Sequence, residues 1–322
     1  MRNLHRSRGA TDQSTSDPFE GIGFLVYQPI PFIDQMFAVA HLPHSFLERT
    51  HQMPNVALLA EVHTVMVEIG GTPIRLYGES ACFLSMARDR YIGFLNPGSR
   101  PRIDLRVDVV SRPNADQEDL RVVREGGLWS AERGDFRLDW DPGSSSGRLQ
   151  LELNAYSLDT ALRIMHTIVL AEQWGFLLHA ASVVRGRRAF LFFGPSGSGK
   201  TTVSRVAPPD VTLLTDEISY VRRDADHHMA YGTPFTGELA KSGENISAHI
   251  AALYQLVKAP ANRLVPMNAA DAARALLGNV LFFAEDPHLV TLIFQSVCDL
   301  VCQLPVYRLE FVPDQTIWDL IQ

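Results

Sequence analysis

The chain has 322 residues, of which 46% are hydrophobic and 20% are charged, with a formal net charge of −7. This balance is typical of a globular protein with a sizeable core, in one large domain or two ordinary ones. Proteins that coat nucleic acid or anionic membranes need a basic surface, so we expect neither as a partner.

The cysteines and the apolar segments indicate a reduced, cytoplasmic setting. Three cysteines do not make a disulfide framework, and Cys298 and Cys302 are expected to stack on one helix face as small core residues. The polar start lacks the apolar core of a secretion signal. The longest apolar stretches, 164–170 and 276–283, are much shorter than the ~18 residues of a membrane span.

The first part of the chain is expected to form a strand-rich domain behind a disordered tail. Residues 1–17 are polar and without pattern. Within 18–110, a helix is possible over 80–89, and Asp104, Arg106 and Asp108 alternate with apolar residues as in a half-buried strand. The other expected strands, separated by turn residues, are 24–27, 56–59, 64–69 and 74–77. The role of this domain stays open.

The second domain is expected to span 111–322 and to begin with a linker or long loop over 112–118. We expect strands at 128–130, 136–140 and 149–154, and then a buried helix over 158–174, capped by Ser157 and ended by Gly175. Strands at 176–184 and 189–193 follow, joined by a basic, solvated turn at Gly186. The second of these strands runs straight into a glycine-rich loop.

The glycine-rich loop is the strongest signal in the sequence. GPSGSGKT matches G-x-x-x-x-G-K-[ST] after an apolar strand and before a short helix, the context in which this motif binds phosphates. Glycines let backbone N–H groups surround an anion, Lys200 reaches the terminal phosphates, and the Thr201 hydroxyl binds magnesium. The residues predicted to bind the nucleotide are Gly194, Pro195, Ser196, Gly197, Ser198, Gly199, Lys200, Thr201 and Thr202.

An acidic pair follows the glycine-rich loop after one short helix and one strand, a spacing that can bring it beside a bound metal and phosphate. Pro208 and Pro209 end the short helix, and an apolar strand over 211–214 leads to Asp216 and Glu217. An acid at this place can hold magnesium or accept a proton from an attacking hydroxyl. The alternative is that Asp216 only caps the strand. The loop also resembles that of transporter ATPases, but the early acid and the absence of an LSGGQ-like signature argue against them.

These residues together resemble the catalytic domain of bacterial HPr kinase/phosphorylase, a relative of the phosphoenolpyruvate carboxykinases. The resemblance rests on LLHAASVV, FLFFGPSGSGKTT, LLTDEISYV and a glycine-bearing return strand, YGTPFTGE, in that order. It implies a mixed-sheet α/β P-loop domain, preceded here by an unrelated strand-rich domain. It further implies that Asp216 is the base, that Thr201 and Glu238 hold the metal with Asp216 and Glu217, and that His179 lies near the transferred phosphate.

Departures from the family narrow what the resemblance implies. The acidic pair is Asp-Glu instead of Asp-Asp, and the arginine-glycine signature loop is missing. Lys241 and Arg263 are weak guesses for the missing cation. These departures argue against HPr itself as the substrate, and a divergent kinase acting on serine in a modified peptide fits better.

The remaining chain is expected to be scaffold. Residues 246–257 are apolar enough for a core strand or a helix face, and Asn268 can cap a helix ending at Leu277. Further helices are expected at 287–302 and 313–322, with a strand at 306–311.

The sequence thus predicts an ATP- and Mg²⁺-dependent kinase that phosphorylates a hydroxyl, with a serine of a protein or peptide favoured. A nucleotide-sensing module with little catalysis and a kinase of free serine or a sugar are the alternatives. A homo-oligomer is possible.

Overall fold

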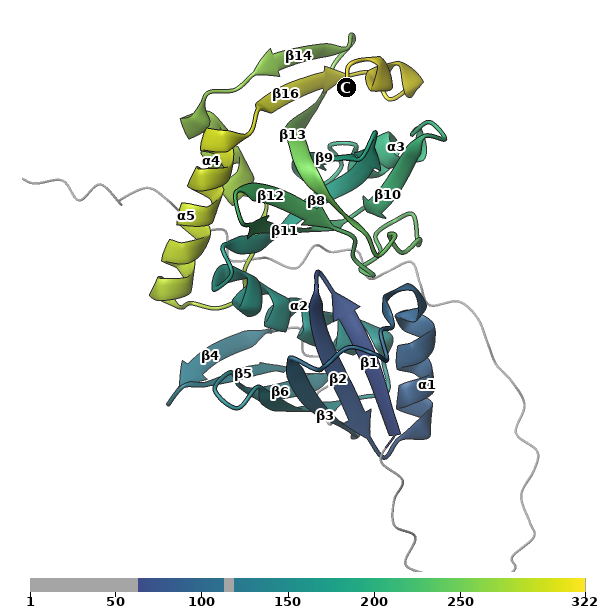
Figure 1. Ribbon diagram of the computed structural model, residues 1–322, viewed down its shortest axis with the longest axis vertical. Helices are drawn as coiled ribbons and strands as arrows, with labels where there is room; N and C mark the ends of the chain where they lie inside the picture. Colours follow the sequence, from purple (N-terminus) through teal and green to yellow (C-terminus); the bar gives the residue numbers. More distant parts are fainter. Residues whose placement is uncertain (1–62, 113–118, 322) are drawn as a thin grey trace, which may run out of the picture.

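The computed structural model describes residues 63–112 and 119–321, which form two mixed β-sheets with helices around them (Figure 1). The predicted α/β class with a strand-rich first part is confirmed. The tail, the strands at 24–27 and 56–59, and nearly all of the linker lie outside these residues. No helix within the described ranges is long and apolar enough to cross a membrane.

The first sheet takes strands from both sides of the expected domain boundary at residue 110. Its order is β1-β2-β3-β7-β6-β5-β4, with β3 parallel to β7, so β4 to β7 extend the sheet that β1 to β3 begin. The two sheets therefore divide after Leu151. The strands are β1 (His63–Ile69), β2 (Thr72–Gly78), β3 (Ile103–Val109), β4 (Arg121–Glu125), β5 (Leu128–Arg133), β6 (Phe136–Asp141) and β7 (Ser146–Leu151).

Helix α2 (Ala155–Ala171) lies between the two sheets and is buried along almost its whole length (Figure 1). It packs against β6 and β7 on one side and against β8 on the other. Asn154, and not Ser157 as predicted, is its N-cap, with the side chain accepting from Tyr156 N. Ser157 lies inside the helix and donates to Asp135 at 2.5 Å, so its hydroxyl is used between elements.

The second sheet follows α2 and carries the predicted loop. It has the order β10-β8-β11-β12-β13-β16-β14, with β9 between β8 and β13 and β15 beside β8. Its strands are β8 (Gly175–Arg185), β9 (Arg188–Phe193), β10 (Val211–Thr215), β11 (Ile218–Asp224), β12 (His227–Tyr231), β13 (Ser247–Lys258), β14 (Arg263–Pro266), β15 (Val280–Leu281) and β16 (Val306–Phe311).

Both faces of this sheet are covered, which explains its nearly continuous apolar strands. Along β9, Leu191 and Phe193 face the core that contains α2, whereas Phe190 and Phe192 face a second cluster. That second cluster includes Val203 of α3 (Lys200–Arg205). The remaining helices are α1 (Ala81–Arg90), α4 (Ala269–Leu277) and α5 (Pro287–Gln303), with short 3-10 turns at Ile92–Phe94 and Gln315–Asp319.

Several local predictions need correction. The expected return strand YGTPFTGE is strand only at Tyr231, because the chain leaves β12 there and crosses to β13 as a loop. The closing helix at 313–322 is a single 3-10 turn. Of the two forms expected for 246–257, the structure has the strand, β13 (Ser247–Lys258). Cys302 is exposed on α5 while Cys298 is half-buried, so the two are not both core residues.

A buried ionic contact joins the first unit, which is the sheet β1 to β7 with α1, to α2. Asp159 accepts from Arg90 Nη2 at 2.6 Å and from the Tyr91 hydroxyl at 2.6 Å. The Asp159 carboxylate and the Tyr91 phenol are both buried, so each gives the other the hydrogen-bond partner that a buried polar group needs. The β1–β2 turn makes a second contact, with Tyr220 of β11 in the second sheet. A Cβ on Gly70 would lie 2.4 Å from the Tyr220 ring, so only glycine fits there.

His166 is a buried titratable group in the middle of α2. Both of its ring nitrogens lack hydrogen-bond partners in the described part of the chain, and the ring packs edge-on against Tyr220 with centroids 5.5 Å apart. Burial lowers the pKa of His166 to about 4. The imidazole is therefore neutral in the folded protein at neutral pH.

We predict that His166 makes the protein acid-sensitive. Between the folded pKa of about 4 and the unfolded pKa of about 6.5, the unfolded chain binds more protons, so stability falls as pH drops through this range. At pH 5 the loss relative to pH 7.5 is about 2 kcal/mol from this residue. Urea denaturation of wild type and His166→Leu at both pH values measures this loss of stability. The other histidines remain in the variant, so the difference between the two proteins belongs to His166. An unchanged pH dependence in His166→Leu would contradict the assignment.

Candidate functional site

The glycine-rich loop connects β9 to α3 and depends on left-handed glycines. Gly197 has φ 73° and Gly199 has φ 112°, a region that side chains with a Cβ rarely adopt. A Cβ on Gly199 would also lie 2.5 Å from Phe311 Cζ. The loop residues Pro195, Ser196 and Gly197 are exposed, so the loop is open to a ligand.

Lys200 is turned back into its own loop. Its Nζ donates to Gly194 O at 2.9 Å and to Pro195 O at 3.3 Å, and the residue is buried. Burial lowers the pKa of Lys200, and the carboxylates of Glu217 and Glu238 act in the opposite direction. The loop carbonyls thus hold the ammonium group where an anion in the loop would meet it.

The pairing of β8 brings His179 and the acidic pair to the level of the loop. Ala180 pairs with Phe193, the last residue of β9, and His179 pairs with Ile218 on β11. On the other side, Ser182 pairs with Thr215 at the end of β10. The chain between β10 and β11, which is Asp216 and Glu217, therefore passes β8 beside the residue where the loop begins.

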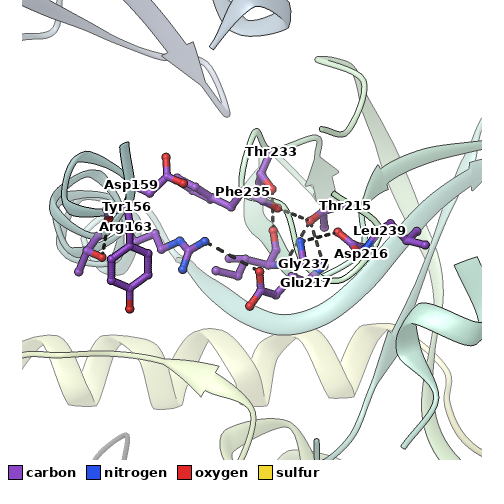
Figure 2. A network of polar contacts seen from close by, with 12 residues as sticks. Tyr156, Asp159, Arg163, Thr215, Asp216, Glu217, Thr233, Phe235, Gly237 and Leu239 are labelled. Atoms are coloured by element: carbon purple, nitrogen blue, oxygen red, sulfur yellow. Dashed lines mark hydrogen bonds and ion pairs between the residues drawn. The ribbon is translucent and has the colours of Figure 1, made fainter. Parts of the chain in front are cut away.

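Asp216 is buried and is engaged by the backbone of the following loop. One carboxylate oxygen accepts from Gly237 N and the other from Leu239 N, both at 2.9 Å (Figure 2). A Cβ on Gly237 would lie 3.0 Å from the Asp216 carboxylate, so the close approach favours glycine. This carboxylate holds the loop over 237–239 in place.

Glu217 lies in a different environment. Its Oε2 is 3.9 Å from Arg163 Nη2, and the two side chains point at one another in Figure 2. Burial raises the pKa of Glu217, Arg163 and Lys200 lower it, and Asp216 and Asp159 raise it further. A carboxylate tuned upward in this way is better suited to accept a proton near neutral pH.

His179 is partly buried next to two cations. Burial lowers the pKa of His179 to about 4, and the charges of Lys200 and Arg163 act in the same direction. The imidazole is therefore neutral at pH 7 and can accept one hydrogen bond and donate another. It is poorly suited to be a proton donor at that pH.

The other predicted metal ligands fit a magnesium ion only in part. Thr201 is the second residue of α3, beside the loop, and Glu238 is exposed but close enough to act on Lys200. No group of three or more potential metal-ligating side chains occurs within 63–112 and 119–321. An oxygen set of hydroxyl and carboxylate does match the preference of Mg²⁺, which usually completes its shell with waters and substrate phosphates.

Arg163 is the site residue that the sequence interpretation missed. The guessed cations lie elsewhere: Lys241 is exposed in the loop before β13, and Arg263 on β14 pairs with Glu310 at 2.8 Å. Arg163 comes from α2 and stacks on Phe235, with its Cζ 4.9 Å from the ring centre. The available signal was the only arginine in a helix expected to be buried, since charged residues are rarely buried without a reason.

Together the fold and the site define a two-sheet α/β protein with a glycine-rich loop between strand and helix and an acidic turn beside it. The chain belongs to the family described as SynChlorMet cassette protein ScmC, whose family model matches residues 150–322. The match begins at the end of β7 and includes α2 and the whole second sheet. No curated protein matches the sequence.

A solved structure of the Hpr(Ser) kinase/phosphatase from Coxiella burnetii is distantly similar. The identity is 13%, the match covers 39% of this chain and 91% of that one, and the TM-score is 0.20. A likeness at this level carries no argument about function. The family shown is thus ScmC, and the expected HPr kinase relationship remains a resemblance of motifs.

The contacts of Asp216 predict a structural effect of its replacement. Asp216→Asn replaces an accepting oxygen with an NH₂ donor opposite a backbone N–H, which leaves a buried donor unpaired and costs about 1–3 kcal/mol. Glu217→Gln, whose side chain holds no backbone group, is the matched control. Urea denaturation and limited proteolysis within 232–246 should show loosening in Asp216→Asn alone. Equal behaviour of the two variants would mean that Asp216 does not hold this loop.

Proposed function

We propose that this protein is an ATP- and magnesium-dependent kinase that transfers the γ-phosphoryl group to a hydroxyl. The observation that carries the proposal is the convergence of Lys200, the glycine-rich loop and the acidic turn at one level of β8. Phosphoryl transfer depends mainly on positioning and charge stabilisation, so these few groups are of the types that the reaction needs.

The nucleotide phosphates would lie in the loop, on its backbone N–H groups and Lys200. An anion there would compete with the Gly194 and Pro195 carbonyls for the ammonium group. Thr201 and Glu238 would hold the magnesium, which when bound neutralises charge on the phosphates.

In the transfer, the acceptor oxygen forms a bond to the γ-phosphorus while the bond from phosphorus to the β,γ-bridging oxygen breaks. ADP leaves with that electron pair, and the acceptor proton passes to a carboxylate. We assign the proton to Glu217, because its burial favours proton uptake and because both oxygens of Asp216 already accept backbone N–H groups. Asp216, the base expected from the motif resemblance, would then act by positioning the loop.

The acceptor class rests on the sequence resemblance alone, which favours a serine of a protein or peptide. Free serine or a sugar would need the same groups at the reaction centre. The second candidate function is a nucleotide sensor with little catalysis. The engagement of Asp216 by the backbone favours it, since an acid used structurally is not available for chemistry.

The deciding measurement uses γ-labelled ATP and magnesium with a lysate of the source cells. We expect a labelled protein or peptide with wild type, none with Lys200→Ala because nucleotide binding is lost, and a loss of at least about 100-fold with Glu217→Gln, whose nucleotide binding stays intact. Arg274→Gln, an exposed change on α4, is the matched control and should transfer at the wild-type rate.

Other outcomes would redirect the assignment. Wild-type transfer by Glu217→Gln would mean that Glu217 is not the base. Nucleotide binding without label, and without hydrolysis above Lys200→Ala, would support the sensor. ATP binding that is unaffected in Lys200→Ala would contradict a phosphate site in this loop.

A further inference from the structure

Arg163 is a cation withdrawn from water without an adequate partner. Its side chain is 17% exposed, and its Nε has no hydrogen-bond partner in the part of the chain that the structure describes. The guanidinium lies over Phe235, which is itself buried. A desolvated guanidinium is stable only when an anion accepts its N–H groups, so the arrangement indicates a missing anionic ligand.

The obvious internal partner is occupied by the first unit. Asp159 lies four residues before Arg163 on α2, a spacing at which opposite charges normally pair. Its carboxylate instead accepts from Arg90 and Tyr91 at 2.6 Å each. The first unit thus takes the acid that would neutralise Arg163 and leaves the guanidinium free for another anion.

Glu217 does not fill this role. At 3.9 Å, its contact with Arg163 is an ion pair longer than a hydrogen bond, and the same carboxylate also lies in the field of Lys200. His179 feels the same two cations and is neutral. Lys200 from the glycine-rich loop and Arg163 from α2 thus both act on His179 and Glu217.

We propose that Arg163 of α2, beside the acidic turn, binds the phosphoryl group in transfer together with Lys200. This inference rests on the proposed kinase function and deepens it. As phosphorus bonds to the acceptor oxygen and releases ADP, negative charge is spread over its three equatorial oxygens, and a guanidinium can donate to two of them at once. Arg163 would then be a catalytic residue supplied by the helix that joins the two units.

The test compares a nucleotide with a terminal phosphate to one without. We measure the Kd of AMP-PNP, a nonhydrolysable ATP analogue, and of ADP, each with magnesium, for wild type, Arg163→Gln and Arg163→Lys. Arg163→Gln should weaken AMP-PNP binding by about tenfold or more and ADP binding by less than about threefold. Arg163→Lys should recover part of the difference, because it keeps the charge and loses the two-donor geometry. Arg274→Gln serves as the control.

The outcomes separate this inference from the function on which it rests. If wild type binds both nucleotides through Lys200 and the ratio of the two Kd values is unchanged in Arg163→Gln, the inference fails and the kinase proposal stands. If both Kd values rise equally and thermal stability falls, Arg163 is structural, and the inference also fails. If Lys200→Ala binds AMP-PNP as wild type does, the kinase proposal itself fails.

Discussion

The pairing of strand β8 is the constraint on which the candidate site depends. Its first half pairs with β11 and β15 and its second half with β9 and β10, so one strand meets four partners. The change of partners occurs between His179 and Ala180, at the level where β9 gives way to the glycine-rich loop. A slip of one residue would turn every side chain of a strand to the other face, and the two faces of this sheet pack in different clusters, so the register is strongly fixed. The positions of His179, the loop and the acidic turn are therefore set by the core.

Helix α2 connects this site to the first sheet. A helix buried between two sheets has little room for charge, yet α2 carries Asp159 and Arg163 on one face. Asp159 contacts Arg90 of the first unit and Arg163 lies near Glu217 of the second sheet, so each charge has a partner on a different side of the helix. Because a buried charge without a partner is costly, the position of the first unit has electrostatic consequences at the site. This gives the strand-rich first unit, whose role was open, a physical connection to the candidate site on the second sheet.

The two acids of the turn show how adjacent carboxylates can lie in different surroundings. Asp216 points to the loop that follows β12 and accepts two backbone N–H groups there. Glu217 points to the opposite side, toward Arg163, where burial raises its pKa. Adjacent residues leave the backbone in different directions, so a motif that places two acids in sequence does not say which one faces the substrate.

The sequence by itself determined what is encoded locally. A glycine at 199 is needed for the left-handed backbone and for the approach of Phe311, and GPSGSGKT is a contiguous phosphate-loop pattern, so the loop and its flanking strand and helix could be read directly. The apolar strands and the caps of α1 and α4 are equally local. Only the tertiary structure decided which distant groups meet. It places Arg163 beside Glu217 and lets Asp216 accept the backbone N–H groups of Gly237 and Leu239. It also pairs β7 with β3, so that the first sheet extends past residue 110. These contacts depend on the relative positions of whole sheets and helices, which arise from packing of the shared core and leave no signal in residue spacing.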